Sequence, residues 1–287
     1  MNRISSQTAA RLSLVRPASR PGTDGRRPGP AAPVPRQATS APALVAVAHG
    51  SRDPRALSTV HALLDRVRAL RPELPVHLGH IEIDEPLLTD TLARLDATDT
   101  ADAVLVPLLL SRGYHVKRDI PETAATARVR TRVAAPLGPH PLLVDALHAR
   151  LTEAGWRAPR TDAERRTSAV VLAAAGSRDP DAAVDTGRTA RLLSARLGVP
   201  VVPAYATTSA PTVPLAIQAL TARGRHRVAV ASYFTAPGRF ATESAAAAPG
   251  PAAAPLGPHE AMARLILHRY DQATAAPART TPHLASA

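Results

Sequence analysis

The chain has 287 residues, enough for two domains of ordinary size, and a formal net charge of +12. It contains no cysteine, which excludes disulfides, iron–sulfur clusters and cysteine nucleophiles, so that any metal must be held by His, Asp or Glu. No apolar run approaches the roughly 18 residues that span a bilayer, and we expect no membrane partner.

The first 41 residues differ in composition from the rest of the chain. They hold seven Arg and six Pro but only one acidic residue, Asp24, and lack the apolar segment of a secretory signal. We expect residues 1–41 to be a disordered Arg/Pro-rich tail on a cytoplasmic protein. The same composition also suits a transit peptide. With aromatic residues at 2%, the basic charge does not predict a nucleic-acid partner.

From residue 43 onward, short apolar runs alternate with segments of helical periodicity. Such alternation, with strands that are apolar on both faces, favours a parallel sheet covered by helices on both sides. The expected elements, in chain order, are strand 43–49, helix 54–71, strand 76–83, a helix opening at Pro86, strand 103–111, strand 131–138 and helix 139–151.

The pattern then runs a second time. "VAVAHGSRDP" at 45–54 returns as "VVLAAAGSRDP" at 170–180, and "PLGPH" at 136–140 returns at 255–259. We infer an internal duplication, with further strands expected at 199–206 and 227–234. The expected domains are an N-terminal domain at 42–151, a polar linker at 152–167, a C-terminal domain at 168–270 and a tail at 271–287.

Chemically active side chains follow three of the expected strands. His49 ends the first, Glu82 lies near the end of the second, and Ser111 to His115 follow the third. Because ligands bind at the carboxyl ends of parallel strands, we expect these segments to converge. Two imidazoles and a carboxylate suit a borderline divalent metal and can accept protons near neutral pH.

Other motif readings are weaker. The chain has no phosphate-binding P-loop, no G-x-S-x-G elbow, no H-E-x-x-H helix and no G-x-G-x-x-G turn. "SRDP" has a structural interpretation, since Ser51 or Asp53 could cap a helix that opens at Pro54. That role would explain why the phrase persists in the second copy.

Three phrases in this order, "VAVAHGSRDP", "GHIEIDEP" and "VLVPLLLSRGYHVKRDIPE", resemble the sirohydrochlorin chelatases, the class II tetrapyrrole chelatases. The similarity covers residues 42–270. It implies an α/β fold of two tandem chelatase-like, flavodoxin-like domains, each a parallel four-stranded sheet with helices on both faces. It also implies an ATP-independent lyase that places Fe2+, Co2+ or Ni2+, as a substrate, into the macrocycle of sirohydrochlorin for sirohaem or cobalamin, with no organic cofactor.

The resemblance assigns site residues by their matching positions. The metal-handling and catalytic residues fall on His49, His115 and Glu82, with Glu85 a weaker substitute for Glu82. Because the substrate is a flat ring with carboxylates around its rim, basic and small residues of the two loops become candidate contacts. The expected substrate-binding residues are Ser51, Arg52, Ser111, Arg112, Gly113, Tyr114, Lys117 and Arg118.

The second copy lacks the reactive side chains. Ala175, Thr207 and Phe240 stand where the first copy has its two histidines and its glutamate. We expect this half to close the cleft and to supply carboxylate contacts, for instance through Arg178 or Arg239, in a monomer with pseudo-dimeric domains. A metal or tetrapyrrole carrier without turnover, and a non-catalytic paralogue, are the alternative functions.

Overall fold

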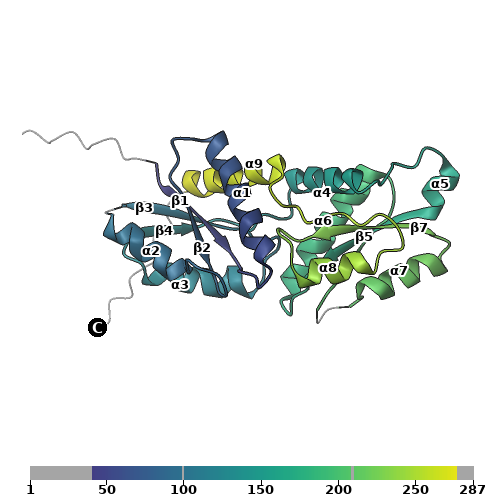
Figure 1. The fold of residues 1–287 in the computed structure, drawn as a ribbon, viewed down its shortest axis with the longest axis horizontal. Helices are drawn as coiled ribbons and strands as arrows, with labels where there is room; N and C mark the ends of the chain where they lie inside the picture. Colours follow the sequence, from purple (N-terminus) through teal and green to yellow (C-terminus); the bar gives the residue numbers. More distant parts are fainter. Residues whose placement is uncertain (1–40, 99, 208–209, 277–287) are drawn as a thin grey trace, which may run out of the picture. The chain divides into compact units, whose positions relative to one another are not determined.

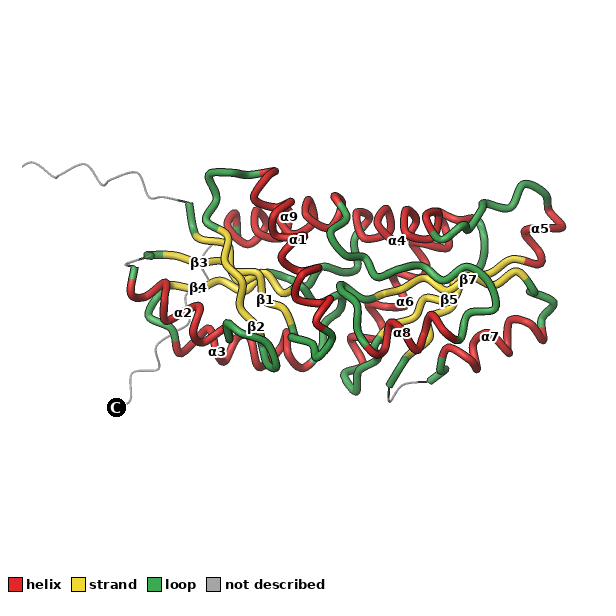
Figure 2. Tube along the Cα trace, viewed as in Figure 1, coloured by secondary structure: helices red, strands yellow, loops and turns green. Residues whose placement is uncertain are grey.

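The structure, a computed structural model, describes residues 41–98, 100–207 and 210–276, so residues 1–40 of the expected tail and 277–287 lie outside it. The described residues belong to one compact unit that begins at Ser40. They form an α/β fold with two separate parallel sheets, and helices lie on both sides of each sheet (Figure 2). None of the helices within these ranges is long and apolar enough to cross a membrane.

The first sheet has four parallel strands in the order β2-β1-β3-β4, as the alternation predicts. The elements of this half are β1 (Ala43–Ala48), α1 (Pro54–Leu70), β2 (Val76–His80), α2 (Leu88–Ala97), β3 (Asp102–Pro107), the π-helical turn η1 (His115–Asp119), α3 (Ile120–Thr126), β4 (Arg130–Val133) and α4 (Pro141–Glu153).

Alternate side chains of β1 face two different layers. Val45 and Val47 pack with α2 and α3 on one face of the sheet. Leu44 and Ala46 pack with α1 and the last helix of the chain on the other face. Because successive strand residues point to opposite faces, both faces of this fully buried strand are covered by helices.

The second sheet has three strands, in the order β6-β5-β7, instead of the expected four. The segment that follows α8 makes one isolated bridge, between Val230 and Ala252. Pro249, Pro251 and Pro255 occur around it and have no N–H to donate to a ladder, which is why the pairing stays short. The elements of this half are α5 (Asp162–Thr167), β5 (Ser168–Ala174), α6 (Pro180–Leu197), β6 (Val201–Tyr205), α7 (Val213–Ala222), β7 (Arg227–Tyr233), α8 (Arg239–Ala246) and α9 (Glu260–Ala275).

Several element boundaries differ from the sequence-based expectation. The strands expected at 76–83, 103–111 and 131–138 end earlier, at His80, Pro107 and Val133. The segment 152–167, treated as a linker, contains α5, whose first turn is closed by a capping box between Thr161 and Glu164. Helix α9 continues to Ala275, so the first residues of the expected C-terminal tail are helical. Tyr270 accounts for part of this extension, because it is buried and its hydroxyl donates to the carbonyl of Pro42 at 2.6 Å.

The last helix of each half packs on the sheet of the other half. Helix α9 packs against α1, β3 and β4, whereas α4 packs against α6 and β7, and the two helices pack against each other (Figure 1). The chain therefore exchanges its final helices between the two repeats. Neither sheet is covered on this side by the helix that follows it in sequence.

The repeated "PLGPH" segments make this exchange reciprocal. In each copy the histidine caps the following helix, His140 for α4 and His259 for α9. Ten residues later an arginine crosses over: Arg150 donates to the carbonyl of Leu256, and Arg269 donates to the carbonyl of Leu137. The arginine of the first repeat therefore binds the second repeat, and the equivalent arginine of the second repeat binds the first.

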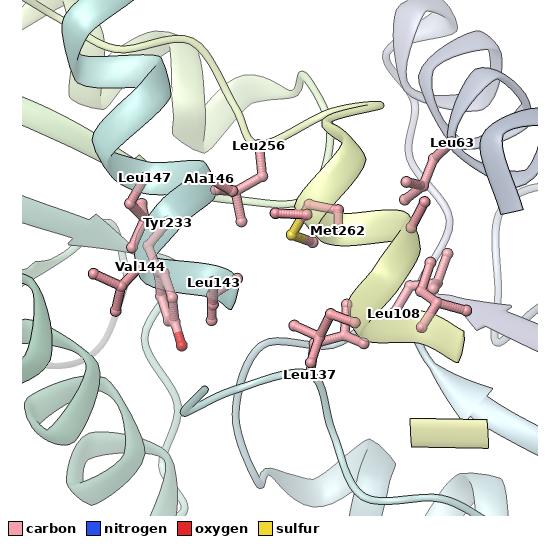
Figure 3. Close-up of a cluster of buried hydrophobic side chains, with 14 of the residues drawn as sticks. Leu63, Leu108, Leu137, Leu143, Val144, Ala146, Leu147, Tyr233, Leu256 and Met262 are labelled. Atoms are coloured by element: carbon pink, nitrogen blue, oxygen red, sulfur yellow. The ribbon is translucent and has the colours of Figure 1, made fainter. Parts of the chain in front are cut away.

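The exchanged helices build one continuous core. Leu143 and Leu147 of α4 and Met262 of α9 are essentially inaccessible to solvent and belong to a single apolar cluster with residues of both sheets. Figure 3 shows α4 side chains beside Tyr233 of the second sheet, and Leu63 of α1 near α9. Since burial of apolar area is the main stabilising contribution to folding, the two halves stabilise each other.

We expect Leu147→Ala to destabilise the whole chain by about 2–5 kcal/mol, because it opens a cavity in this shared core. Urea unfolding followed by tryptophan fluorescence of Trp156 and by far-UV circular dichroism should give one coincident transition. Leu192→Ala, at an exposed position on α6, is the control and should change stability little. Two separate transitions, with only one shifted by the variant, would contradict the shared core.

Candidate functional site

A cleft of about 1500 Å³ lies where the carboxyl ends of β1 and β3 meet those of β5 and β7. His49 and His115 line it on the N-terminal half, and Ala175 and Phe240 line it on the C-terminal half. This is the edge at which parallel sheets bind ligands. Its volume exceeds the range of roughly 300–1000 Å³ that is usual for small-molecule pockets, so it admits a large ligand.

Glycine is required next to His49. Gly50 has a φ of +101°, and a Cβ added there would lie 1.8 Å from the carbonyl oxygen of Glu82. The amide of Glu82 also donates to the carbonyl of His49 at 3.1 Å, and the amide of Ser51 donates to Asp84 Oδ2 at 2.9 Å. The loops after β1 and β2 are therefore held against each other, and this contact brings Glu82 to His49.

The three residues expected to carry the chemistry are neighbours. His49 Nε2 lies 3.7 Å from Glu82 Oε1, and the imidazole rings of His49 and His115 meet edge to face, with centroids 4.8 Å apart. All three side chains are partly exposed. Both histidines line the cleft, but Glu82, although it lies beside His49, is not among the residues that line it.

Asp119 is a partner that the sequence analysis missed. Its Oδ2 lies 2.5 Å from His115 Nδ1, across one turn of η1. A carboxylate that accepts from Nδ1 fixes the tautomer and orientation of the imidazole and leaves Nε2 as the free lone pair. The signal in the sequence was the spacing of four residues between His115 and Asp119, which places them on one helix face.

The expected three-ligand metal set is not assembled in this conformation. Within the described ranges, no three His, Asp or Glu side chains are arranged to hold a metal ion together. His49 and His115 are adjacent, but Glu82 reaches only His49. Two imidazoles alone form an open and weak site, to which water or a ring nitrogen can add.

Five of the eight expected substrate-binding residues line the cleft: Ser51, Arg52, Ser111, Gly113 and Tyr114. Tyr114 is 62% exposed, and Ile83, which also lines the cleft, is 53% exposed. Ile83 has a φ of +71°, an uncommon conformation for a β-branched residue, and was not anticipated. Exposed apolar side chains at this position can cover the face of a flat ligand.

Arg112, Lys117 and Arg118 are absent from the described lining of the cleft. Arg112 is paired with Asp185 and Lys117 with Asp179, while Arg118 lies 3.9 Å from Glu122 on the surface of α3. The positive charges of Arg112 and Lys117 are thus neutralised within the chain.

The repeated "SRDP" phrase caps a helix in both halves, as its structural interpretation predicts. Asp53 accepts from the amide of Arg55 at the start of α1, and Asp179 accepts from the amide of Asp181 at the start of α6. The two equivalent arginines, Arg52 and Arg178, project from these turns and make no ion pair with the described residues. Each copy of the turn therefore carries one arginine whose guanidinium group makes no ion pair with the described residues.

The C-terminal wall of the cleft carries no titratable counterpart of the histidines. Thr207 stands at the position of Glu82, and Ala175 stands at the position of His49. The hydroxyl of Thr207 donates to the carbonyl of Ala175 at 2.6 Å. Arg239 stacks on Phe240, with its guanidinium carbon 4.7 Å from the ring centroid. This wall therefore offers a guanidinium and an aromatic ring to a ligand in place of the imidazoles.

We expect Gly50→Ala to destabilise the chain well beyond the roughly 1–2 kcal/mol that a left-handed alanine costs, because its Cβ would overlap the carbonyl of Glu82. Gly155→Ala is the matched control, since Gly155 has a φ of +90° but open space around a Cβ. Urea unfolding of the two variants measures the difference. Equal losses of stability would show that the close approach of the two loops is not important.

Comparison with known proteins agrees with the fold. The model of the CbiX family matches residues 43–154 and 169–273, one match in each repeat and together well over half of the chain. A sirohydrochlorin ferrochelatase of Bacillus subtilis is 30% identical over 176 residues, covering 59% of this chain and 64% of the relative. A sirohydrochlorin cobaltochelatase of Methanococcoides burtonii is 28% identical over 123 residues, covering 38% of this chain and 94% of the relative.

Solved structures share the architecture. SirB from Bacillus subtilis with Fe3+ superposes with a TM-score of 0.67 at 23% identity, covering 81% of this chain and 95% of that one. CbiX, described as the terminal enzyme for biosynthesis of sirohaem in denitrifying bacteria, superposes with a TM-score of 0.61 at 20% identity, covering 80% and 99%. With the family model matched in both repeats, the chain belongs to the CbiX family.

Proposed function

We propose that this chain is a sirohydrochlorin chelatase that inserts a divalent metal ion, Fe2+ or Co2+, into the macrocycle without ATP. The observation that carries the proposal is the pair of adjacent imidazoles, His49 and His115, which come from two different strand ends and face one large cleft. The names of the relatives, which include both ferrochelatases and cobaltochelatases of sirohydrochlorin, support it.

The reaction requires a site that binds a cation weakly and accepts protons. Two pyrrole N–H protons leave the ring nitrogens as the metal ion enters, and the ion must lose part of its water shell. His49 and His115 offer nitrogen lone pairs that suit Fe2+ and Co2+, and the metal passes from them to the ring. Glu82, 3.7 Å from His49, receives or relays the protons towards solvent.

Asp119 and the open coordination favour transfer over storage. Asp119 holds His115 with Nε2 free, so that this nitrogen is oriented before the metal ion arrives. A carrier that retains metal would need three or four converging ligands, and the described residues offer no such group. The absence of cysteine removes the thiolates that would hold soft metals tightly.

The shape and charge of the cleft suit a flat polyanion. Arg52 lines the cleft on the N-terminal half and makes no ion pair with the described residues, and Arg239 lines it on the C-terminal half, so both guanidinium groups can bind rim carboxylates. Ile83 and Tyr114 offer apolar surface to the ring face. The C-terminal half thus contributes to binding the substrate although it lacks the reactive side chains.

The test is metal insertion by the purified chain. Sirohydrochlorin is mixed anaerobically with Fe2+, Co2+ or Ni2+, and the visible spectrum of the ring is followed against the uncatalysed rate. We expect repeated turnover that falls by at least about 100-fold in His49→Ala and in His115→Ala, because each removes a ligand or a proton acceptor. His226→Ala, an exposed histidine on the turn before β7, is the control and should retain the wild-type rate.

Tight binding of metal or ring without turnover would indicate a carrier instead and refute the chelatase. Full activity in His49→Ala and His115→Ala would refute the assignment of these residues. The metal that is inserted fastest identifies the product.

We expect Asp119→Asn to lower the rate about 10–100-fold, the usual effect of removing the carboxylate that orients a metal-binding histidine. The asparagine keeps the size of the side chain but can present its amide N–H to the ring nitrogen and so select the other tautomer. Thermal unfolding should remain close to that of the wild type. A wild-type insertion rate in this variant would show that Asp119 does not orient His115 for the reaction.

A further inference from the structure

The loop that carries His115 is held in place by side chains of the C-terminal half. The hydroxyl of Thr235 donates to the carbonyl of Leu108 at 2.9 Å, and the hydroxyl of Tyr233 donates to the carbonyl of Leu110 at 2.8 Å. The amide of Arg112 donates to Asp185 Oδ2 at 2.9 Å. Every second residue from 108 to 112 is therefore bound to a side chain more than 70 residues away in sequence.

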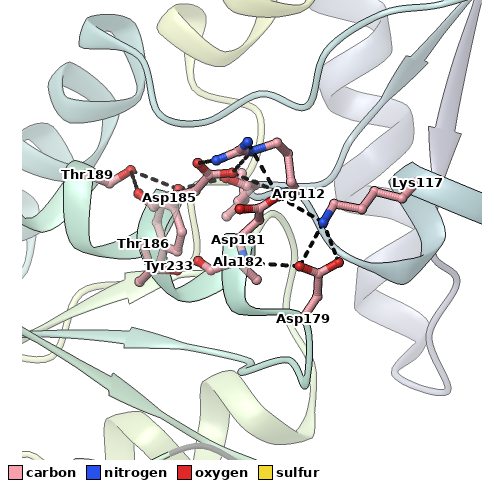
Figure 4. Close-up of polar contacts among 10 residues, drawn as sticks. Arg112, Lys117, Asp179, Asp181, Ala182, Asp185, Thr186, Thr189 and Tyr233 are labelled. Atoms are coloured by element: carbon pink, nitrogen blue, oxygen red, sulfur yellow. Dashed lines mark hydrogen bonds and ion pairs between the residues drawn. The ribbon is translucent and has the colours of Figure 1, made fainter.

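Asp185 makes the contact with Arg112 (Figure 4). Its side chain is fully buried, at 0% exposure, and accepts three hydrogen bonds from Arg112: from the backbone amide, from Nε at 2.9 Å and from Nη2 at 2.8 Å. A buried carboxylate without a partner is strongly destabilising, so this pair cannot open without a large penalty. Arg112 is thereby fixed three residues before His115.

A second set of ion pairs lies on the other side of His115. Lys117 Nζ is 2.7 Å from Asp179 and 2.9 Å from Asp181, at the start of α6. These groups are more exposed, and surface ion pairs contribute little individually. They nevertheless connect the loop to the same helix that carries Asp185, so His115 stands between two attachments to α6.

Two of these three acidic residues, Asp181 and Asp185, belong to the second repeat alone, whereas Asp179 corresponds to Asp53. The alignment of the two "SRDP" turns places Asp181 and Asp185 opposite Arg55 and Thr59 of the first repeat. The C-terminal half has thus lost the reactive side chains and holds carboxylates where the catalytic half has none. This asymmetry indicates a specific task for the second half.

We propose that Asp185, assisted by the hydroxyls of Tyr233 and Thr235, is a positioning residue that holds the His115 loop in register with His49. The inference rests on the proposed chelatase function of the same cleft. It assigns to the C-terminal half the alignment of two imidazoles from different strands, because their edge-to-face contact depends on where the loop after β3 lies. Asp185 itself does not line the cleft and touches neither imidazole.

The ionisation of Asp185 agrees with this geometry. Burial alone would raise the pKa of Asp185, but the hydrogen bonds from Arg112 outweigh it and hold the pKa below its ordinary value. A lowered carboxyl pKa stabilises the folded state above the unfolded pKa of about 4, and this contribution is lost as the pH falls through the folded value. The ion pair is therefore fully formed near neutral pH.

The test compares Asp185→Asn with Asp271→Asn in the full chain. Asp271 also makes a bidentate pair with an arginine, Arg71, between the two halves, but it is half-exposed and away from the cleft, and it is the control. We expect Asp185→Asn to lower kcat for metal insertion about 10–100-fold with little change in the KM for sirohydrochlorin. Asp271→Asn should leave kcat unchanged even if it lowers the melting temperature.

A double-variant comparison separates positioning from general stability. If Asp185 acts through His115, Asp185→Asn should have almost no further effect on the residual rate of His115→Ala. Equal losses of kcat in the Asp185 and Asp271 variants, or an undiminished effect in the His115→Ala background, would overturn the proposal. Should Asp185→Asn fail to fold, Thr235→Val, which removes one hydroxyl, is measured in the same way.

Hydrogen exchange gives a readout that does not depend on activity. Asp185→Asn should speed amide exchange in residues 108–119 and leave the segment after β1 unchanged, because only the first is attached to α6. Unchanged exchange in 108–119 would refute the positioning role. If the wild-type chain inserted no metal, the proposed function would fail, while this exchange experiment would still decide what Asp185 does.

Discussion

The exchange of α4 and α9 is the constraint on which the rest of the structure depends. Each helix covers the sheet of the opposite repeat, and Arg150 and Arg269 each donate to a carbonyl of the opposite "PLGPH" segment. Because one apolar cluster runs through both halves, neither sheet is complete without the other. The carboxyl ends of β1 and β3 are consequently brought to those of β5 and β7, and the cleft exists only because of this arrangement.

The two repeats contribute different groups to this cleft. The first holds the side chains that we propose to be reactive: His49 with Glu82 beside it, and His115 with Asp119 bound to its Nδ1. The second supplies the opposite wall and the contacts that hold the loop after β3. A duplicated domain that lacks the histidines of its partner can still position a loop, because positioning needs only hydrogen bonds and buried charge.

Much of the fold and part of the site could be predicted from the sequence. Apolar runs and helical spacing indicated where the strands lie, although three of them end earlier than expected and the proline-rich segment around Ala252 makes one bridge instead of a strand. The expected convergence of three side chains holds for His49, which lies beside both Glu82 and His115, because strand ends of a parallel sheet share an edge. Glu82 reaches only His49. Arg112 and Lys117 have the right charge for substrate carboxylates, but their partners lie on α6, and no local pattern reveals that.

The sequence by itself determined the duplication, the parallel α/β class, the capping of a helix by the "SRDP" turn, and the three candidate site residues His49, Glu82 and His115. These properties follow from periodicity, from turn chemistry and from the order of strand ends, all of which act over a few residues or within one repeat. Only the tertiary structure decided which helix covers which sheet and which charges face the cleft. Those outcomes depend on contacts between residues far apart in sequence, such as Arg112 with Asp185 and Arg150 with Leu256, whose formation requires the whole chain to fold.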